Sequence, residues 1–309
     1  MDISVILPVV ERYDNFEKLY REFASEFSGL GKSFEFIFVV DGSFEAAFEE
    51  LKRIRENNPG IKIIKLTKDF GESTPHSVGF EKSNGEYIFT LASYFQVDAS
   101  AVGEIWKEIG MGTDLVVTRR FPRTDSKVNQ IQSYVYHWLI RKIIALRFHD
   151  ISCGLKGMKR KVFEEIRLYG DLHRFIPVLA HNQGFKIKEI KAAQRKEDTA
   201  LRLVRPGAYA RRVLDILTIF FITKFTMKPL RFFGLIGMVL ATLGGSITCY
   251  LGVYRILGLG PIADRPFLLL GVLLMVLGVQ TVSIGLLGEI IIFTHAREVK
   301  EYNVSEFLE

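Results

Sequence analysis

The sequence predicts an α/β protein with a mainly parallel sheet, followed by two membrane-spanning helices. The first observation is that short apolar strand patterns alternate with helical patterns along the N-terminal half of the chain. This alternation is typical of βαβ units, whose helices cover both faces of a parallel sheet. The second observation is a pair of uncharged apolar runs near the C-terminus, 232–254 and 267–288, each long enough to cross about 30 Å of hydrocarbon.

The composition fits this division of the chain. Its 309 residues suffice for one sizeable α/β domain with an appendage, and 48% of them are hydrophobic, a share raised by the C-terminal runs. The net charge is +6, with basic residues gathered in 119–147 and 186–231. These residues either form solvated helix faces or attract lipid head groups and phosphate ligands. They accompany no nucleic-acid-binding module, so nucleic acid is not expected as a partner.

The first strands and helices have clear patterns. The segment 3–8 is rich in β-branched residues and ends at a proline, as expected of a strand. Large apolar residues at helical spacing follow in 14–27. The apolar run 34–40 predicts a second strand, and 44–57 predicts a second helix that stops at an Asn-Pro-Gly turn.

The later elements continue the alternation. The segment 61–66 predicts a third strand and 73–83 a third helix, and the apolar run 87–91 predicts a fourth strand directly after an Asn-Gly turn. The remaining expected elements are a strand at 114–118, a long helix at 129–146, and a strand followed by the start of a helix within 154–166.

The C-terminal part is predicted to anchor the chain in a membrane. The segment 208–225 is apolar on one side and basic on the other, as in a helix that lies along a membrane surface. Basic residues flank the hairpin but are few in its connector, so the positive-inside rule places both termini in the cytoplasm. We expect a multi-pass protein of the cytoplasmic membrane, or of an endoplasmic-reticulum-type membrane in a eukaryote, with no cleavable signal peptide. The expected divisions are a cytoplasmic domain at 1–205, an amphipathic juxtamembrane region at 206–231, two spans (about 232–256 and 266–291) within 232–293, and a cytoplasmic tail at 294–309.

Acidic residues follow two of the predicted strands. Asp41 comes directly after the second strand, and Asp69 follows the third strand closely. The carboxyl ends of parallel strands meet at one edge of the sheet, where a carboxylate can accept hydrogen bonds from a base or a ribose. An Asp-Gly pair is also an ordinary turn, but its repetition at successive strands favours a nucleotide-binding cleft.

Several motifs together carry a resemblance to a known family. They are Ser4-Val5-Ile6-Leu7-Pro8-Val9 with Asn15, Val40-Asp41-Gly42-Ser43, Asp69-Phe70-Gly71 with Gly79, Gly85-Glu86-Tyr87, Asp150-Ile151-Ser152-Cys153-Gly154-Leu155-Lys156, His173-Arg174-Phe175-Ile176-Pro177 and Gly184-Phe185-Lys186-Ile187. Their order and spacing resemble those of family 2 glycosyltransferases with the GT-A fold, in the subgroup of dolichyl- and polyprenyl-phosphate sugar synthases. The resemblance covers nearly the whole chain. It implies transfer of a sugar from a nucleotide sugar to an undecaprenyl or dolichyl phosphate at the cytoplasmic membrane face, for cell-envelope glycan or glycoconjugate synthesis.

The resemblance also implies which residues form the site. The leaving diphosphate and the acceptor phosphate are both anionic, so cationic side chains must hold them. Arg119 and Arg120 are both candidates, and the resemblance favours Arg119. The catalytic residues implied are Lys156, Arg119 and Asp150. The nucleotide-binding residues implied are Pro8, Val10, Asp41, Asp69 and Ser93. The residues expected to bind the lipid phosphate are Arg174, Arg205, Arg211 and Arg212.

The chain departs from the family pattern at several site positions. The family's Asp-x-Asp after the fourth strand, which holds Mg²⁺ or Mn²⁺, falls on Ala92-Ser93-Tyr94. Neither Ala92 nor Tyr94 can ligate a divalent ion as a carboxylate does, which leaves Asp98 as the remaining candidate ligand. The first acid of the family's Asp-Asp-Gly-Ser is Val40, and its Tyr-Asn-Glu is Val10-Glu11-Arg12.

These departures leave more than one function open. The sequence favours an active transferase with unusual or absent metal dependence. The main alternative is a catalytically inactive paralogue that acts as a regulatory or scaffold subunit. A purely structural two-span protein or transporter component is disfavoured, because the spans carry no central ionisable residue to form a substrate pathway. Glycines in the spans permit close helix packing, either within the hairpin or between copies in a homo-oligomer.

Overall fold

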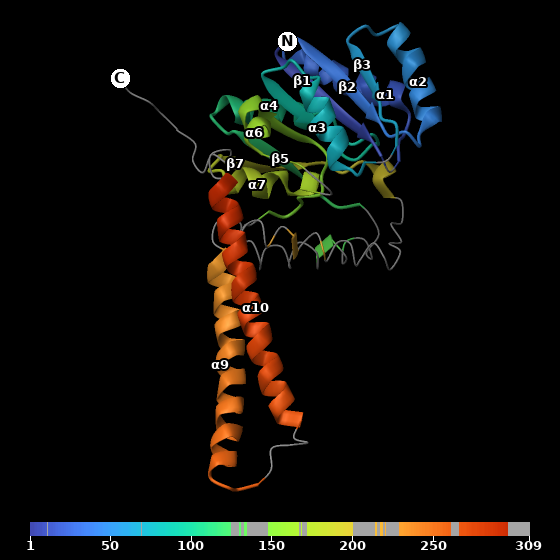
Figure 1. Ribbon diagram of the computed structural model, residues 1–309. Coiled ribbons are helices and arrows are strands. Elements are labelled where there is room, and N and C mark those ends of the chain that lie inside the picture. The colour runs from blue at the N-terminus through green and yellow to red at the C-terminus, as the bar shows by residue number, and fades with distance from the viewer. Residues whose placement is uncertain are drawn as a thin grey trace. The chain divides into compact units, whose positions relative to one another are not determined.

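The computed structural model describes most of the chain in two compact units. The described residues are 1–10, 12–68, 70–124, 130, 133–134, 148–166, 168, 172–199, 214, 217–218, 220, 229–260 and 266–295. One unit is built from the strands and helices within Met1–Ile219, and the other from the helices within Phe220–Glu301. Figure 1 labels the elements of both units.

Seven strands form one sheet in the N-terminal unit, in the order β3-β2-β1-β4-β6-β5-β7. Every neighbouring pair is parallel except those that involve β6, which runs antiparallel to both β4 and β5. The predicted α/β fold with a mainly parallel sheet is therefore confirmed. The strands are β1 (Ile3–Val9), β2 (Phe34–Val40), β3 (Ile61–Lys65), β4 (Tyr87–Thr90), β5 (Leu115–Arg120), β6 (Lys156–Lys159) and β7 (Ile187–Ala192).

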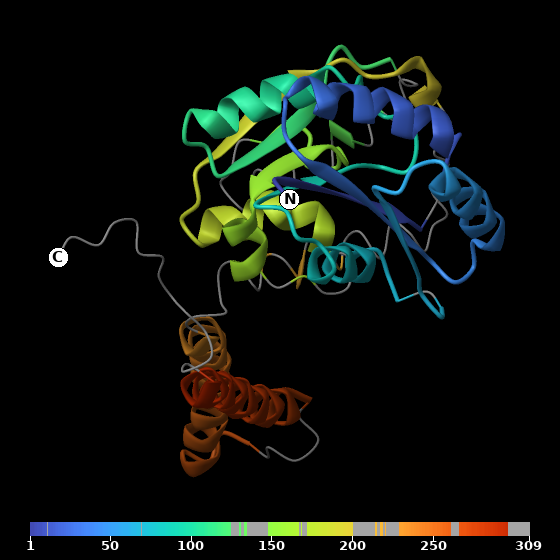
Figure 2. The ribbon, with the colours of Figure 1, turned by 90° about the horizontal axis from the view of Figure 1, so that it is seen from above.

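Helices cover both faces of this sheet (Figure 2). Buried apolar side chains of α1, α2 and α4 form one cluster with the strands, and those of α6 and α7 form a second cluster on the other side. The α3 helix joins the second cluster through Phe80. The helices are α1 (Phe16–Gly29), α2 (Glu45–Glu56), α3 (Ser73–Glu81), α4 (Ala101–Gly110), α6 (Arg160–Glu165) and α7 (Ile176–Asn182), with 3-10 turns η1 (Leu172–Phe175) and η2 (Lys196–Thr199).

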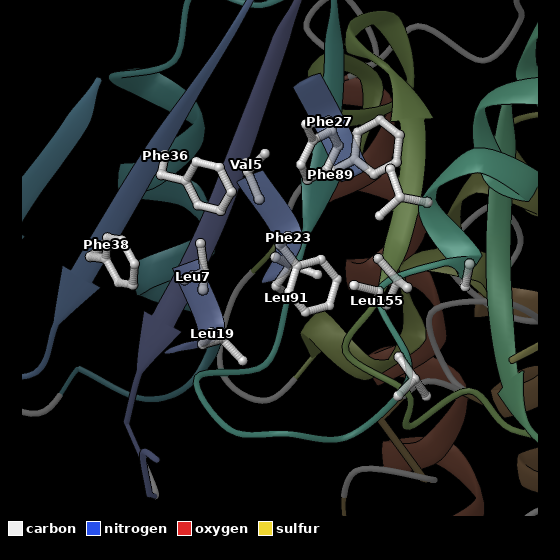
Figure 3. Packing of buried hydrophobic residues seen from close by; sticks show 14 of the residues in the cluster. Val5, Leu7, Leu19, Phe23, Phe27, Phe36, Phe38, Phe89, Leu91 and Leu155 are labelled. Carbon is white, nitrogen blue, oxygen red and sulfur yellow. The ribbon is translucent and has the colours of Figure 1, made fainter. Parts of the chain in front are cut away.

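Phenylalanine rings dominate the first cluster (Figure 3). The ring of Phe27 on α1 meets that of Phe89 on β4 edge to face, with 5.0 Å between the centroids, and that of Phe36 on β2 at 5.9 Å. Each fully buried side chain of this kind contributes about 1.5–3 kcal/mol. This packing fixes α1 on the strands, and it therefore fixes the loops that leave the carboxyl ends of β1 and β4.

Most of the expected elements are present, with ends shifted by a few residues. The strand expected at 114–118 is β5, and the segment 154–166 supplies β6 and α6. The helices α4 and α7 and the strand β7 were not predicted. The helices expected at 129–146 and 208–225 lie almost wholly outside the described residues.

Two long helices, α9 (Pro229–Ile256) and α10 (Pro266–His295), form the second unit. Each contains a stretch long and apolar enough to cross a membrane, which agrees with the two predicted spans. Most of their large apolar side chains are exposed, as expected of helices that face lipid. The divisions at 205, 231 and 293 and the orientation of the termini remain predictions.

Glycines bring α9 and α10 close together. A Cβ built on Gly244 would lie 2.5 Å from the carbonyl oxygen of Gly271, and one built on Gly237 would lie 2.6 Å from that of Gly278. Side chains at these positions would push the two backbones apart. Small residues at a helix contact are the usual solution inside a membrane, where close backbone approach drives association. Packing within the hairpin therefore accounts for these glycines.

Replacing Gly244 with leucine should weaken the hairpin. Overpacking of this kind costs about 1–3 kcal/mol, so we expect the helical signal of detergent-purified protein to melt at a lower temperature. Gly252→Leu on the same helix is the matched control, because a Cβ at Gly252 has no neighbour within 4 Å among the described residues. Equal melting of the two variants would show that the glycine contact does not hold the helices together.

Candidate active site

The carboxyl ends of β1 and β2 carry an acidic turn. Asp41 follows β2 directly; its backbone N–H donates to the carbonyl of Val9 at the end of β1, at 3.0 Å. Oδ1 of Asp41 accepts from the N–H and the hydroxyl of Ser43, both at 3.0 Å, while Oδ2 has no hydrogen bond from the described residues. The Asp-Gly-Ser segment is thus an ordinary turn that also holds one carboxylate oxygen ready for a donor on a ligand.

The turn after β2 lies directly against the segment after β3. A Cβ on Gly42 would lie 2.7 Å from the backbone carbonyl carbon of Thr67, so a side chain at Gly42 would separate the two segments. The predicted nucleotide-binding residues Pro8 and Val10 lie at the end of β1 and just after it. Asp69, also predicted, lies outside the described residues.

Ser93 joins the loop after β4 to the loop after β1 by two hydrogen bonds. Its hydroxyl donates to the carbonyl of Arg12 at 2.7 Å, and its own carbonyl accepts from the N–H of Asp14 at 3.1 Å. The carboxylate of Asp14 accepts in turn from the N–H of Phe95, at 2.9 Å. The predicted site residue Ser93 is therefore buried between the two loops and joins them; its nucleotide-binding role remains a prediction.

The side chains of Arg12 and Tyr94 stack where the loops after β1 and β4 meet. The guanidinium carbon of Arg12 lies 3.8 Å from the centroid of the Tyr94 ring. Nη2 of Arg12 lies 3.6 Å from Oδ1 of Asp198. This puts a cation over Tyr94, the residue at the second aspartate of the Asp-x-Asp pattern. Sequence patterns gave no sign of this contact, because its partners are far apart along the chain.

Gln96 joins the loop after β4 to the loop before β6. Its Nε2 donates to the hydroxyl of Tyr94 at 3.0 Å, and its Oε1 accepts from the N–H of Gly154 at 2.6 Å. A Cβ on Gly154 would lie 2.8 Å from the backbone nitrogen of Ala92, so the two loops touch at backbone distance. Gln96, which the sequence analysis missed, therefore couples the expected nucleotide loop to the segment that leads into Lys156.

A buried ionic network lies beside these loops. Arg120, at the end of β5, donates through Nε to Oδ2 of Asp150 at 2.7 Å and through Nη2 to Oδ1 at 3.0 Å. Its Nη1 reaches Oδ2 of Asp198 at 3.2 Å. Burial opposes the charged form of Arg120, but the carboxylate of Asp150 outweighs that effect and raises the pKa of the arginine. Asp150 was predicted to be catalytic. Both oxygens of its carboxylate accept from Arg120, which favours a role for Asp150 in positioning that arginine.

Lys156 is the buried cation of the second cluster. It lies on β6 opposite Val117, and its Nζ donates to the carbonyl of Cys153 at 2.5 Å. Burial lowers the pKa of Lys156 from 10.5 to about 8. The amine is therefore charged at neutral pH but loses its proton more readily than an exposed lysine does.

Glu72, which precedes α3, forms a compact group with residues of α3 and η1 near Lys156. The charge of Lys156 also acts on His76 and Arg174. Glu72 accepts from Nη2 of Arg174 at 2.8 Å and lies 2.7 Å from Nε2 of His173. The His76 and His173 rings stack with 5.4 Å between their centroids. Burial lowers the pKa of His76 well below 6.5, and His173 and Lys156 lower it further.

Arg119 shares a sheet face with Lys156, because it lies two residues beyond Val117 on β5 and side chains alternate along a strand. Its guanidinium lies over the Phe121 ring at 5.2 Å. The structure thus places the predicted cations Arg119, Lys156 and Arg174 on one side of the sheet. Arg205, Arg211 and Arg212, predicted to bind the lipid phosphate, lie outside the described residues.

The side chains after β4 do not suit a divalent metal. Such ions bind carboxylate and carbonyl oxygens, but Ala92 offers no side-chain oxygen. The hydroxyl of Ser93 is bonded to a backbone carbonyl, and the ring of Tyr94 faces a guanidinium. In the part of the chain that the structure describes, no group of three or more His, Cys, Asp or Glu residues is arranged to hold a metal.

Asp98 does not replace the missing carboxylates. Its Oδ1 accepts from the N–H and the hydroxyl of Ser100, at 3.0 and 2.6 Å, and these bonds lower the pKa of Asp98. Its Oδ2 faces Arg195, with 3.9 Å to Nη1. The carboxylate of Asp98 thus stabilises the turn that leads into α4 and forms an ion pair with Arg195. It faces this cation rather than other acidic groups.

Solved structures share the fold of the N-terminal unit. The fold matches that of glucosyl-3-phosphoglycerate synthase from Mycobacterium tuberculosis in complex with UDP, with a TM-score of 0.54 and 14% identity over 72% of this chain and 79% of that one. The same synthase with Mn²⁺, UDP-glucose and glycerol 3-phosphate matches with a TM-score of 0.51 and 17% identity over 71% and 79% of the chains. The N-terminal unit is therefore a GT-A-type domain.

The chain belongs to glycosyl transferase family 2, whose family model matches residues 4–167. It is 26% identical to dodecaprenyl-phosphate galacturonate synthase of Rhizobium johnstonii over 96% of this chain and 90% of that protein. It is 28% identical to undecaprenyl-phosphate 4-deoxy-4-formamido-L-arabinose transferase of Salmonella paratyphi B over 99% and 93%. Both similarities extend through the helical unit as well as the sheet unit.

Proposed function

We propose that this protein transfers a sugar from a nucleotide sugar to the phosphate of a polyprenyl lipid at a membrane. The observation that carries the proposal is similarity over the full length, including both apolar helices, to two enzymes named for sugar transfer to polyprenyl phosphates. Three cations that could bind an acceptor phosphate, Arg119, Lys156 and Arg174, lie on one side of the sheet. The two apolar helices support attachment to the membrane that holds such a lipid.

The chemistry assigns a role to each group. A phosphate oxygen of the lipid attacks the anomeric carbon, a new oxygen–carbon bond forms, and the bond to the nucleoside diphosphate breaks. The acceptor is already ionised, so the site needs little general-base help and must mainly hold two anions in line. We assign nucleotide contacts to Asp41 and the backbone near Val10, and acceptor-phosphate contacts to Lys156, Arg119 and Arg174. The predicted roles of Asp69, Arg205, Arg211 and Arg212 belong to the same proposal.

A transfer assay tests this function. The full chain in detergent is incubated with undecaprenyl phosphate and a panel of radiolabelled nucleotide sugars, and label is measured in the organic extract. We expect at least one donor to label the lipid, and we expect no label with undecaprenol, which lacks the phosphate. Failure with every donor, with and without Mn²⁺ or Mg²⁺, would contradict the proposal and favour the inactive regulatory subunit.

A further inference from the structure

We propose that the guanidinium of Arg12, stacked on Tyr94, takes the place of a divalent metal and binds the diphosphate of the nucleotide donor. This inference rests on the proposed function, because it assumes a nucleotide sugar at the carboxyl edge of β1, β2 and β4. It goes further by naming the cation that would neutralise the leaving diphosphate. It implies that donor binding by this chain is independent of Mg²⁺ and Mn²⁺.

The position of Arg12 is the first argument. The backbones of Arg12 and Ser93 are joined by the hydroxyl of Ser93, so the side chain of Arg12 starts beside the loop that holds the metal in metal-dependent relatives of the fold. The guanidinium carbon of Arg12 lies 3.8 Å from the centroid of the Tyr94 ring, so a cation–π contact stabilises the guanidinium there. Where the family has an acidic metal ligand, this chain thus has a tyrosine whose ring contacts the guanidinium of Arg12.

The charge balance around Arg12 is the second argument. Within the described residues, Arg12 forms an ion pair with Asp198 at 3.6 Å. Asp198 also accepts from Arg120, at the shorter distance of 3.2 Å. Arg120 is held on its other side by both oxygens of Asp150. Two carboxylates thus serve two guanidinium groups, and Arg12 lies at the end of the row with the looser contact. Of the two guanidinium groups, that of Arg12 is therefore the easier one for an anionic ligand to engage.

The unused hydrogen bonds of Arg12 are the third argument. Nε and Nη2 are buried yet donate to no acceptor among the described residues, although unsatisfied buried donors are costly. The side chain as a whole is 29% exposed, and Nη1 is not among its buried unsatisfied donors. Arginine binds phosphate groups through pairs of parallel N–H bonds, and a diphosphate would supply the acceptors that these donors lack.

The hydrogen bond that joins the loops after β1 and β4 does not depend on the Arg12 side chain, because the Ser93 hydroxyl donates to the backbone carbonyl of Arg12. Side-chain variants should therefore keep the loop in place. Arg12→Gln removes the charge, Arg12→Lys keeps it without the planar fork, and Tyr94→Leu removes the aromatic ring but keeps the arginine. Arg21→Gln is the matched control, because Arg21 is exposed on α1 and pairs with Glu17 one turn away.

The experiment is calorimetric titration of the full chain with UDP, GDP, CDP and dTDP, in EDTA and in Mn²⁺. We expect at least one nucleotide to bind in EDTA, with an affinity that Mn²⁺ changes by less than about threefold. Arg12→Gln should weaken that binding by about 10- to 100-fold, which corresponds to about 1.4–2.7 kcal/mol. Arg12→Lys and Tyr94→Leu should weaken it by smaller factors, and Arg21→Gln should leave it unchanged.

Each contrary result has a distinct meaning. Binding that requires Mn²⁺ would overturn the inference and leave the proposed function standing. Metal-independent binding that survives both Arg12→Gln and Tyr94→Leu would also overturn it, since another cation would then hold the diphosphate. Binding of no nucleotide under either condition would overturn the proposed function together with the inference. Thermal unfolding of each variant shows whether it retains the fold.

Discussion

Replacing Arg120 with methionine is expected to lower the free energy of unfolding of the sheet unit by about 3–5 kcal/mol. The substitution leaves the carboxylates of Asp150 and Asp198 in the interior, where their side chains are 2% and 1% exposed. A buried carboxylate that loses a counter-ion keeps its desolvation cost and loses a large part of the attraction that offsets it. For a unit of this size, the loss corresponds to a melting temperature lower by roughly 6–20 °C.

The neighbouring Arg119→Met variant is the control for this measurement. Arg119 lies on the same strand but is only half-buried and rests on the Phe121 ring, so its removal should cost no more than about 1 kcal/mol. Thermal and urea unfolding of both proteins in detergent, followed by tryptophan fluorescence, provides the comparison. Similar losses in the two variants would mean that the Asp150–Arg120–Asp198 network does not stabilise the edge of the sheet.

Replacing Lys156 with methionine is expected to reduce the rate of sugar transfer by about 10²- to 10³-fold, the usual effect of deleting a preorganised electrostatic group. The same change should make the protein more stable. Burial lowers the pKa of Lys156 from 10.5 to about 8, so the charged amine costs up to about 3 kcal/mol at neutral pH. Loss of its hydrogen bond to the Cys153 carbonyl offsets about 1 kcal/mol of that gain.

The pH dependence of Lys156 follows from the same shift. The transfer rate should fall as pH rises through about 8, where the folded protein loses this proton. Between about 8 and 10.5 the unfolded chain binds more protons at Lys156 than the folded chain does, so this group makes the free energy of unfolding rise with pH in that window. Lys156→Met should lack that rise.

Lys159→Met is the control on the same strand. Lys159 pairs with Asp114 at 2.8 Å and is partly exposed, so its loss should change the transfer rate by less than about twofold, as expected of a surface ion pair. A transfer rate that stays constant to pH 10, or a fully active Lys156→Met variant, would remove Lys156 from the acceptor site.

The fold was largely predictable because its central strands are continuous apolar runs. The strands β1, β2 and β4 are buried on both faces, and this burial requires the apolar patterns that the sequence displays. The edge strand β7 was missed because adjacent charged residues break its apolar pattern, as in Ile187-Lys188-Glu189-Ile190. The antiparallel direction of β6 was also not predicted, since an apolar pattern carries no information about strand direction.

The site was only partly predictable, for a different reason. Motifs pointed to Asp41 and Lys156, whose positions follow from local order along the chain. The roles of Arg12, Gln96 and Asp198 depend on contacts between segments that only the folded sheet brings together. Sequence reasoning identified the loss of the carboxylates at Ala92 and Tyr94, but the guanidinium that now lies there belongs to another loop.

The sharing of Asp198 between two arginines has a consequence for biosynthesis. Asp198 is made 186 residues after Arg12 (198 minus 12), which at about 5–20 residues per second is a delay of roughly 10–40 s. It precedes the start of α9 at Pro229 by 31 residues (229 minus 198). The nascent chain therefore carries the guanidinium of Arg12 without its partner Asp198 until shortly before the first apolar helix is translated. The last carboxylate of this network is thus translated close in time to the first apolar helix.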